Sequence, residues 1–248
     1  MLHKIASNQS FLYFYQINAI QMFKNLLNLF YPEVCFGCSS LLQSNEIAIC
    51  TSCRHEIPLT LHHFNPDNEA LKKFYGKIPV EFAATYVYFH KKGIVQHLIH
   101  NLKYNGHQEI GTVLGNWYSA ELHKIEILEK IDEIIPVPLH KKKLRERGYN
   151  QVTSFGKSLA TNLNLSYNDC LLIRSKYSKT QSKKNLLNRI DMNNQSVFEA
   201  VYGEKDYGKH FLIIDDVLTT GSTLEACGKA LLKIPGAKIS ILCMAMSH

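Results

Sequence analysis

Two adjacent carboxylates, Asp215 and Asp216, stand between a run of apolar residues and a loop of small, hydroxyl-bearing residues. The apolar run, residues 211–214, has no polar break and predicts a strand buried on both faces of a parallel sheet. The loop precedes a segment with helical apolar spacing, so free backbone N–H groups and the helix dipole favour an anion such as phosphate. Because carboxylates repel a bare phosphate, the ligand should also carry hydroxyls or a metal, and a phosphorylated ribose with Mg²⁺ meets both requirements. The candidate phosphate-loop residues are Thr219, Thr220, Gly221, Ser222 and Thr223.

Residues 211–223 resemble the thirteen-residue PRPP-binding motif of the type I phosphoribosyltransferases at every position. The resemblance implies that Asp215 and Asp216 hydrogen-bond the ribose hydroxyls, and that Val217 and the loop complete the PRPP site, with the loop on the 5′-phosphate. If the domain is catalytic, a nucleophile displaces pyrophosphate from C1 of PRPP, and the two carboxylates favour the positive charge that develops on the ring. An ordinary Asp-capped turn is the alternative, but such a turn does not need four hydroxyls around a glycine.

Four of the seven cysteines form two Cys-x-x-Cys pairs, which are separated by eleven residues. Such pairs place four thiolates at the corners of a tetrahedron, the geometry of structural zinc. The alternatives are disulfides, redox pairs or a rubredoxin-like iron. Disulfides are disfavoured without a secretion signal, and redox pairs without a thioredoxin-type βαβ unit. We expect one structural zinc ion bound by Cys35, Cys38, Cys50 and Cys53.

The densest positive charge in the chain, residues 140–151, follows a predicted strand at residues 133–138. Charge runs are usually solvated loops. Here, however, Arg147 and Gly148 come directly before a segment with helical spacing, which is a second loop-to-helix anion site. Because this segment lies one sheet connection before the phosphate loop, we expect it to contact the pyrophosphate end of the ligand. The candidate pyrophosphate residues are Lys103, Arg145, Arg147 and Gly148.

Residues 174–194 form a polar, basic segment with no acidic residue before Asp191. The segment is either a lid that orders over a polyanionic ligand or a flexible surface loop. Type I phosphoribosyltransferases carry a mobile hood loop at about this position, and the resemblance therefore favours the lid. The candidate lid residues are Arg174, Lys176, Gln181 and Arg189.

The segments between these motifs alternate between strand and helix patterns, which predicts an α/β domain. The expected class is a type I phosphoribosyltransferase-like, mainly parallel sheet flanked by helices, with a small N-terminal four-cysteine zinc finger. The three remaining cysteines stand in apolar surroundings and are expected in the core. The expected strands are 80–88, 133–138, 211–214 and 238–246, the expected helices include 94–102 and 107–124, and the lone cysteines are Cys170, Cys227 and Cys243.

The predicted domains are an N-terminal extension with an amphipathic helix (1–30), a zinc finger (31–65), a linker (66–79) and the phosphoribosyltransferase-like domain (80–248). We expect the helix after Met22 to pack on the body of the protein, with membrane or partner docking as the alternative. The pattern changes on either side of Met22, so either Met1 or Met22 is the start.

Composition restricts the class of protein. A hydrophobic fraction of 46% with 20% charged residues is typical of a soluble globular chain and excludes a disordered one. No apolar run approaches the roughly 20 residues of a membrane span, and the first 20 residues lack the features of a secretory signal. We therefore expect a cytoplasmic protein. The net charge of +7 suits anionic ligands, either phosphates or nucleic acid.

The whole arrangement resembles the ComF family, which joins a four-cysteine zinc finger to a type I phosphoribosyltransferase-like domain. The resemblance covers about residues 22–248. For naturally competent bacteria it implies a cytoplasmic role in handling imported single-stranded DNA, with competence helicase or recombination-mediator proteins as partners. Besides the cysteines and the PRPP motif, the resemblance depends on residues 102–104, on Val137, Pro138 and residues 147–151, and on Arg174, Gln181, Arg189 and Asn193.

Two classes of function follow. The first is a PRPP-dependent phosphoribosyltransferase or sensor, with zinc as a structural metal and Mg²⁺ bound with PRPP. The second is a nucleic-acid-binding or regulatory accessory protein that keeps the fold without catalysis. Proteins that bind single strands interleave aromatic and basic residues so that bases can stack. The basic segments contain only Tyr149 and Tyr177 as aromatics, so DNA binding has the weaker support from sequence.

Overall fold

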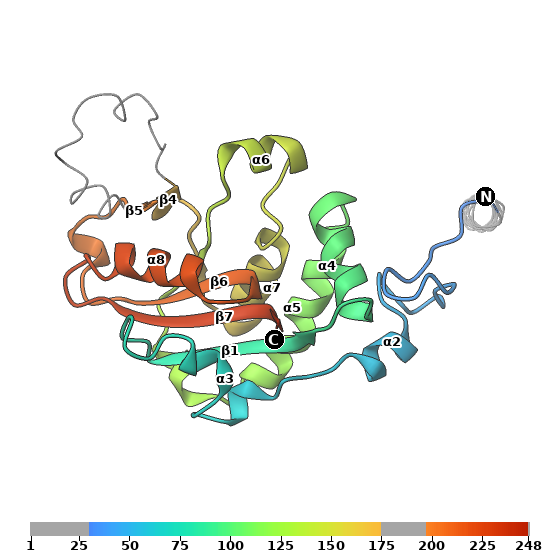
Figure 1. Ribbon diagram of the computed structural model, residues 1–248, viewed down its shortest axis with the longest axis horizontal. Coiled ribbons are helices and arrows are strands. Elements are labelled where there is room, and N and C mark those ends of the chain that lie inside the picture. The colour runs from blue at the N-terminus through green and yellow to red at the C-terminus, as the bar shows by residue number, and fades with distance from the viewer. Residues whose placement is uncertain (1–29, 175–196, 248) are drawn as a thin grey trace, which may run out of the picture.

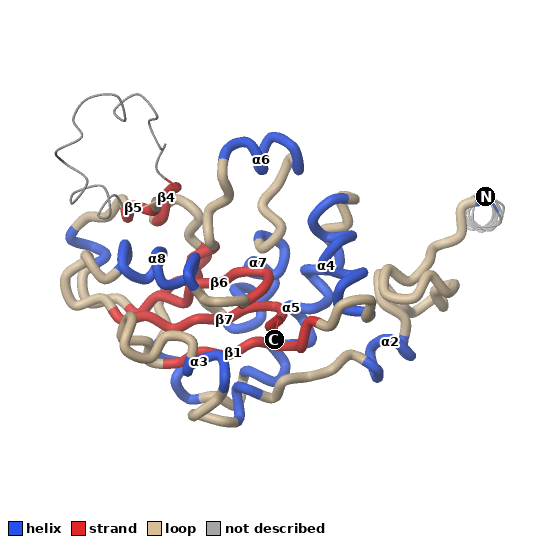
Figure 2. The backbone as a smooth tube through the Cα atoms, viewed as in Figure 1, coloured by secondary structure: helices blue, strands red, loops and turns tan. Residues whose placement is uncertain are grey.

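A five-stranded, entirely parallel sheet forms the centre of the protein, in the strand order β1-β7-β6-β2-β3 (Figures 1 and 2). The computed structural model describes residues 30–174 and 197–247. The sheet confirms the predicted α/β class. Its strands are β1 (Phe82–Phe89), β2 (Glu133–Pro136), β3 (Ser166–Tyr167), β6 (His210–Leu218) and β7 (Lys238–Ser247).

Helices cover both faces of this sheet, and each face has its own hydrophobic core. The strand β6 explains why its sequence is apolar without a break. Leu212 and Ile214 point into one core, while Phe211 and Ile213 point into the other. The first core contains α4 (Ile94–Tyr104), α5 (Glu109–Leu122) and α7 (Thr153–Leu163); the second contains α3 (Glu69–Lys72), α8 (Ser222–Leu231) and the antiparallel pair β4 (Leu172–Arg174) and β5 (Phe198–Ala200).

The chain leaves the two neighbouring strands β2 and β6 in opposite directions. From β2 it passes through α7 to β3 at one edge of the sheet, and from β6 it passes through α8 to β7 on the other side. Because α7 and α8 cover opposite faces, the chain connections diverge between β2 and β6, whose carboxyl ends lie side by side. We call the region outside these two strand ends the crevice, because an open α/β sheet has its crevice at such a topological switch point. Ligands of open α/β sheets bind at such a switch point.

Residues 66–79 differ from the expected linker, because they are packed against the second core. Their apolar residues Ala70, Phe74 and Ile78 lie four positions apart, on one helical face, and are 0%, 1% and 9% exposed. Pro66, Gly76 and Pro79 suggested a linker, and they are exposed, but the apolar face of the segment still packs against the core. The short helix α3 begins at an Asn68 cap, whose side chain accepts a hydrogen bond from the Leu71 amide.

Two smaller expectations also change. The basic run after β2 is not a loop but a two-turn helix, α6 (Lys141–Arg147), which begins at a His140 cap and ends at Gly148. Cys170, expected in the core, is exposed, because it lies in the turn between β3 and β4, where its amide donates to the Asn168 side chain. Cys227 and Cys243 are buried as expected.

The segment that follows the zinc-finger cysteines covers the outer edge of β1. The helix α2 (Thr51–Glu56) ends before Pro58, and the chain then pairs antiparallel with β1. The Thr60 amide donates to the carbonyl of Tyr86 at 3.0 Å, and the Tyr88 amide donates to that of Pro58 at 2.8 Å. This pairing protects the edge strand from another chain. Three short 3₁₀ turns complete the described structure: His62–Phe64, Glu126–Lys130 and Glu204–Asp206.

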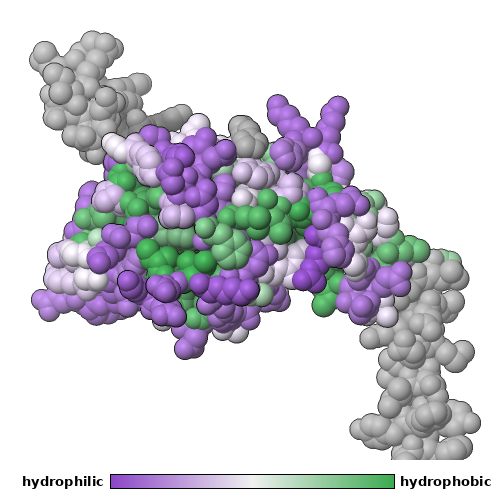
Figure 3. Space-filling view, turned by 90° about the horizontal axis from the view of Figure 1, so that it is seen from below, coloured by the Kyte–Doolittle hydropathy of each residue, from purple (hydrophilic) through white to green (hydrophobic). Residues whose placement is uncertain are grey.

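The surface seen from below is mixed, with apolar side chains grouped between hydrophilic ones (Figure 3). Within the described ranges, no helix is long and apolar enough to cross a membrane.

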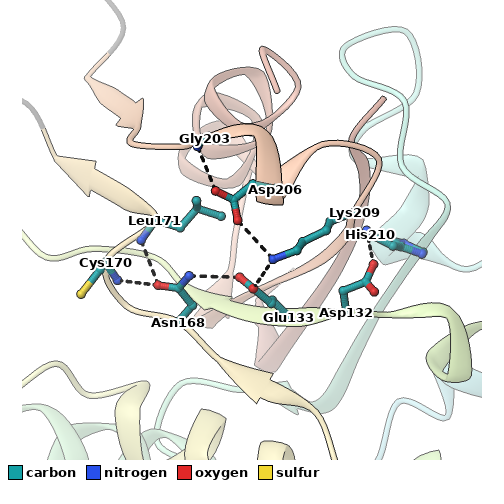
Figure 4. A network of polar contacts seen from close by, with 9 residues as sticks. All are labelled: Asp132, Glu133, Asn168, Cys170, Leu171, Gly203, Asp206, Lys209 and His210. Carbon is teal, nitrogen blue, oxygen red and sulfur yellow. Dashed lines mark hydrogen bonds and ion pairs between the residues drawn. The ribbon is translucent and has the colours of Figure 1, made fainter. Parts of the chain in front are cut away.

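A closed polar network joins the amino-terminal ends of β2 and β6 (Figure 4). The Lys209 ammonium lies 2.6 Å from Glu133 and 3.1 Å from Asp206. The second carboxylate oxygen of Glu133 accepts from Asn168 at 3.0 Å, and that of Asp206 accepts from the Gly203 amide at 3.0 Å. Every carboxylate oxygen of this pair of acids therefore has a donor, which fixes the start of the sheet.

Candidate ligand-binding crevice and metal centre

The two carboxylates predicted to bind the ligand lie within β6, at its carboxyl end. Asp216 is 6% exposed and accepts hydrogen bonds from the Lys103 ammonium, at 2.9 Å, and from the side-chain amide of Gln151. The other end of Gln151 accepts from the Arg147 guanidinium at 2.6 Å. One chain of polar contacts therefore connects the end of α4, the segment after β2 and the end of β6.

Asp215 lies in a different environment, because neighbouring residues of a strand point to opposite faces of the sheet. One of its carboxylate oxygens accepts from the backbone amide of Asp216 at 2.8 Å. Burial, together with the adjacent charge of Asp216, raises the pKa of Asp215 to about 7, although Lys103 and Lys143 act in the opposite direction. A ligand that brings a cation or hydroxyl donors would therefore satisfy a carboxylate that the protein itself stabilises poorly.

The predicted phosphate loop forms the turn between β6 and α8. Gly221 caps α8 with φ 80° and ψ 0°, a left-handed conformation that favours glycine. A Cβ atom at this position would lie 3.1 Å from the ring of Phe74 and 3.6 Å from the Cβ of Lys73. Residues 66–79 therefore pack against the loop at Gly221.

The loop presents its polar groups outward. Its four hydroxyl-bearing residues are exposed, and the cap residue Gly221 has no side chain to occupy the N-terminus of α8, where the Thr220 hydroxyl accepts from the Ser222 amide at 3.4 Å. The Thr220 hydroxyl lies 3.2 Å from that of Ser222. The backbone amides at the N-terminus of α8 and the loop hydroxyls together form the kind of site that binds phosphate. The exposed hydroxyl residues are Thr219, Thr220, Ser222 and Thr223.

The predicted pyrophosphate residues are divided between two places. Lys103 and Arg147 belong to the polar chain at Asp216, whereas Arg145 is exposed on α6. Gly148 ends α6 with φ 78°, and its amide donates to the Leu144 carbonyl at 2.8 Å. That amide is therefore occupied by the helix and is not open to an anion.

Sequence reasoning gave no role to Gln151, which bridges Arg147 and Asp216. The available signal was its position four residues after Arg147. Of the candidate lid residues, Arg174 ends β4 with its guanidinium carbon 5.3 Å from the ring centroid of Phe198. The other three, Lys176, Gln181 and Arg189, lie outside the described residues.

The four paired cysteines converge, as their spacing predicted. Their sulfur atoms all lie within 4.8 Å of one another, and those of Cys38 and Cys50 are 3.7 Å apart. A tetrahedral zinc site with Zn–S bonds of about 2.3 Å requires sulfurs about 3.8 Å apart. Backbone amides of Gly37 and Cys50 donate to the Cys35 sulfur at 3.3 and 3.2 Å, which stabilises a thiolate. The residues present therefore fit a structural metal, with Cys35, Cys38, Cys50 and Cys53 as its ligands.

The first cysteine pair packs directly on α4. A ring nitrogen of His97 lies 3.0 Å from the Gly37 carbonyl, and the Asn101 amide donates to the Phe36 carbonyl at 3.2 Å. A Cβ on Gly37 would lie 2.9 Å from a methyl group of Ile94, so only glycine allows this close approach. Since Lys103 is on the last turn of α4, one helix connects the cysteine cluster to the crevice.

Comparisons with known proteins agree with this arrangement. The phosphoribosyl transferase domain family matches residues 154–248. DNA utilization protein YhgH of Escherichia coli O157:H7 is 30% identical over 151 residues, which cover 59% of this chain and 65% of that protein. Competence protein ComFC of Bacillus subtilis (strain 168) is 26% identical over 206 residues, which cover 81% of this chain and 78% of that protein.

The chain thus spans about two thirds of the length of the YhgH relatives that it matches. Among solved structures, glutamine PRPP amidotransferase from B. subtilis, complexed with ADP and GMP, matches with a TM-score of 0.39 and 16% identity, over 57% of this chain and 30% of that one. The domain match, the competence-protein relatives and the four-cysteine cluster together agree with the resemblance to the ComF family.

Proposed function

We propose that the crevice between β2 and β6 binds PRPP, or a closely related phosphorylated ribose, together with Mg²⁺. The observation that supports this most directly is the pairing, at the end of one strand, of an open helix start with a carboxylate whose pKa is raised. The loop at residues 219–223 would hold the 5′-phosphate. Asp215 and Asp216 would hold the ribose hydroxyls, and their oxygens are also of the type that Mg²⁺ prefers.

Lys103 and Arg147 would hold the pyrophosphate. Both cations lie on the polar chain that ends at Asp216, so they are already aimed at the crevice. A guanidinium matches the geometry of phosphate oxygens, and an ammonium supplies a compact positive charge. In a transfer reaction the same two groups would stabilise the departing pyrophosphate.

The relatives are named for DNA utilization and for competence. We therefore assign this chain to the uptake of DNA in the cytoplasm, where it would handle imported single strands beside competence helicase or recombination-mediator proteins. In that role the protein would catalyse phosphoribosyl transfer from PRPP. The alternative is an accessory protein that binds nucleic acid, with PRPP as a regulator rather than a substrate.

Calorimetric titration of PRPP in the presence of Mg²⁺ tests the ligand assignment. The wild-type protein should bind one PRPP per chain. The double variant Asp215→Asn/Asp216→Asn should lose most of this affinity, because it removes both ribose-facing carboxylates. The matched control is Asp67→Asn, which removes an exposed carboxylate that pairs with Lys72 on the surface. Equal affinity in the wild type and the double variant would refute the assignment.

A further inference from the structure

Tyr104, the last residue of α4, is a large aromatic side chain that stays 64% exposed beside the crevice. The guanidinium carbon of Arg147 lies 5.1 Å from the centroid of its ring. The ring of His100 also lies near Tyr104, with its centroid 5.1 Å away at an interplanar angle of 48°. Three flat groups from two separate helices therefore lie close together, and much of the Tyr104 side chain is open to solvent.

The polar chain of the crevice holds this group of side chains in place. Arg147 is fixed by its 2.6 Å hydrogen bond to Gln151, and Lys103, next to Tyr104, is fixed by Asp216. The hydroxyl of Tyr149 also donates to the carbonyl of Leu102, which ties the end of α4 to the segment after α6. An aromatic surface that is ordered before binding loses little conformational entropy when a ligand stacks on it.

The neighbouring helix α6 carries the charge that a polyanion requires. Lys141, Lys142, Lys143 and Arg145 are exposed, and Glu146 is the only acidic residue of the helix. In Figure 1, α6 and α4 project side by side from the same side of the sheet. Helix α6 has no aromatic residue of its own, but the fold supplies one from a segment about 40 residues earlier.

We propose that Tyr104 is a stacking platform for a nucleobase of single-stranded nucleic acid, whose phosphates lie along α6. An exposed ring beside a guanidinium recognises the flat face of any base, and the cations of α6 recognise the backbone. A duplex hides its base faces, so it would meet only the cations. The inference rests on the proposed role in DNA handling and names the surface that contacts the strand.

Fluorescence anisotropy with two labelled ligands tests the platform: an oligothymidylate of about 20 nucleotides and an abasic oligonucleotide of the same length. Tyr104→Ala should weaken oligothymidylate binding about tenfold and leave abasic binding unchanged, because only bases stack. Tyr104→Phe should keep wild-type affinity. Tyr207→Ala is the matched control, since Tyr207 is 48% exposed but precedes the amino-terminal end of β6, and it should bind both ligands as the wild type does.

The possible failures can be told apart. Unchanged oligothymidylate affinity in Tyr104→Ala, or equal losses for both ligands, would overturn the platform while leaving a role in DNA handling. A wild-type protein that binds no single strand would overturn both the platform and the DNA role. Tighter binding of a duplex than of a single strand would also overturn the platform. PRPP titration of Tyr104→Ala should match the wild type, and a loss there would mean that Tyr104 supports the crevice instead.

Discussion

The two ends of β6 carry the same kinds of charged residue in opposite electrostatic states. At the amino-terminal end, burial alone would raise the pKa of Asp206, but the Gly203 amide and Lys209 hold it below its ordinary value. At the carboxyl end, burial and the charge of Asp216 raise the pKa of Asp215 to about 7. The first carboxylate is stabilised by its neighbours, and the second is not.

The difference lies in how many donors reach each acid. Around Lys209, the carboxylate oxygens of Glu133 and Asp206 are matched by three donors: the Lys209 ammonium, the Asn168 side chain and the Gly203 amide (Figure 4). At the other end, Lys103 and Gln151 both serve Asp216, and Asp215 has the single backbone amide as its donor among the described contacts. A satisfied cluster stabilises the fold, whereas an incompletely satisfied one can be completed by a ligand.

The largest expected effect comes from a change in the cysteine cluster, because α4 connects this cluster to the carboxyl end of β6. Cys35→Ser should lose the zinc ion and lower the free energy of unfolding by several kcal/mol, since binding of a structural zinc contributes directly to folding. It should also weaken PRPP binding, because α4 carries Lys103. Metal analysis, thermal unfolding and PRPP titration measure the three effects.

The matched control is Cys170→Ser, which changes an exposed cysteine outside the cluster and should retain both zinc and stability. Wild-type protein prepared without chelator and found free of zinc would contradict the metal assignment. Retained PRPP affinity in zinc-free Cys35→Ser would instead contradict the connection through α4.

The next largest effect is a loss of PRPP binding when the carboxyl end of β6 is changed, whereas a change near its amino-terminal end should leave binding normal. Gly221→Val should reduce PRPP affinity at least 100-fold, because a β-branched residue is strained at φ 80° and its side chain meets Phe74. Gly203→Ala, at φ −134° and with open space around the added Cβ, should bind PRPP normally. PRPP titration of both variants, with thermal unfolding as a check of folding, makes the comparison. Undiminished affinity in Gly221→Val would mean that the loop does not hold the phosphate.

Replacing one lysine near each end of β6 should then separate the effect on stability from the effect on PRPP binding. Lys209→Met should lower the free energy of unfolding by about 2 kcal/mol, because it leaves the buried carboxylate of Asp206 and the half-buried one of Glu133 without their cation. Its PRPP affinity should stay normal. Lys103→Met should cost about as much stability but also weaken PRPP binding about tenfold or more.

Lys72→Met is the control for both variants, because its pair with Asp67 is largely exposed and should contribute less than about 1 kcal/mol. Urea unfolding and PRPP titration of the three variants give the comparison. Equal PRPP losses in Lys209→Met and Lys103→Met would show that the two ends of β6 do not differ in function.

Sequence reasoning identified those parts of the site whose residues are close together in the sequence. The loop after Asp216 and the two cysteine pairs depend on the spacing of adjacent residues, and the parallel sheet depends on unbroken apolar runs such as residues 211–214. These patterns are local, so the chain itself displays them.

The contacts that sequence reasoning missed join distant residues. Lys103 and Asp216 are 113 positions apart, and nothing in either neighbourhood specifies the pairing. Phe74 supports Gly221 across nearly 150 positions, and the prolines and glycine around it resembled a linker. The contact between Tyr104 and Arg147 likewise exists only once α4 and α6 are brought together. Tertiary packing decides such contacts, and local patterns do not record it.

The smallest expected effect is the pH dependence of PRPP binding and of stability, which distinguishes the two ends of β6 because Asp215 and Asp206 titrate in different pH ranges. If PRPP with Mg²⁺ needs Asp215 ionised, a pKa of about 7 means that affinity should rise about tenfold between about pH 6 and about pH 8. Binding near pH 7 should release about half a proton per chain. Calorimetry in buffers of different ionisation enthalpy measures that release, and Asp215→Asn should show less of it.

The pH dependence of stability without ligand provides an independent check of the direction in which the pKa of Asp215 is shifted. Between about pH 4 and about pH 7 the Asp215 carboxyl is ionised in the unfolded chain but protonated in the folded one, so the folded state binds more protons. Its contribution to the free energy of unfolding should therefore fall as pH rises through this range, and Asp215→Asn should remove the fall. Asp206, whose pKa is lowered, contributes stability that is present above about pH 4 and is lost only as pH falls below that value. Identical pH profiles of unfolding for the wild type and Asp215→Asn would show that the carboxyl end is as well satisfied as the amino-terminal end, and the contrast between the two would not stand.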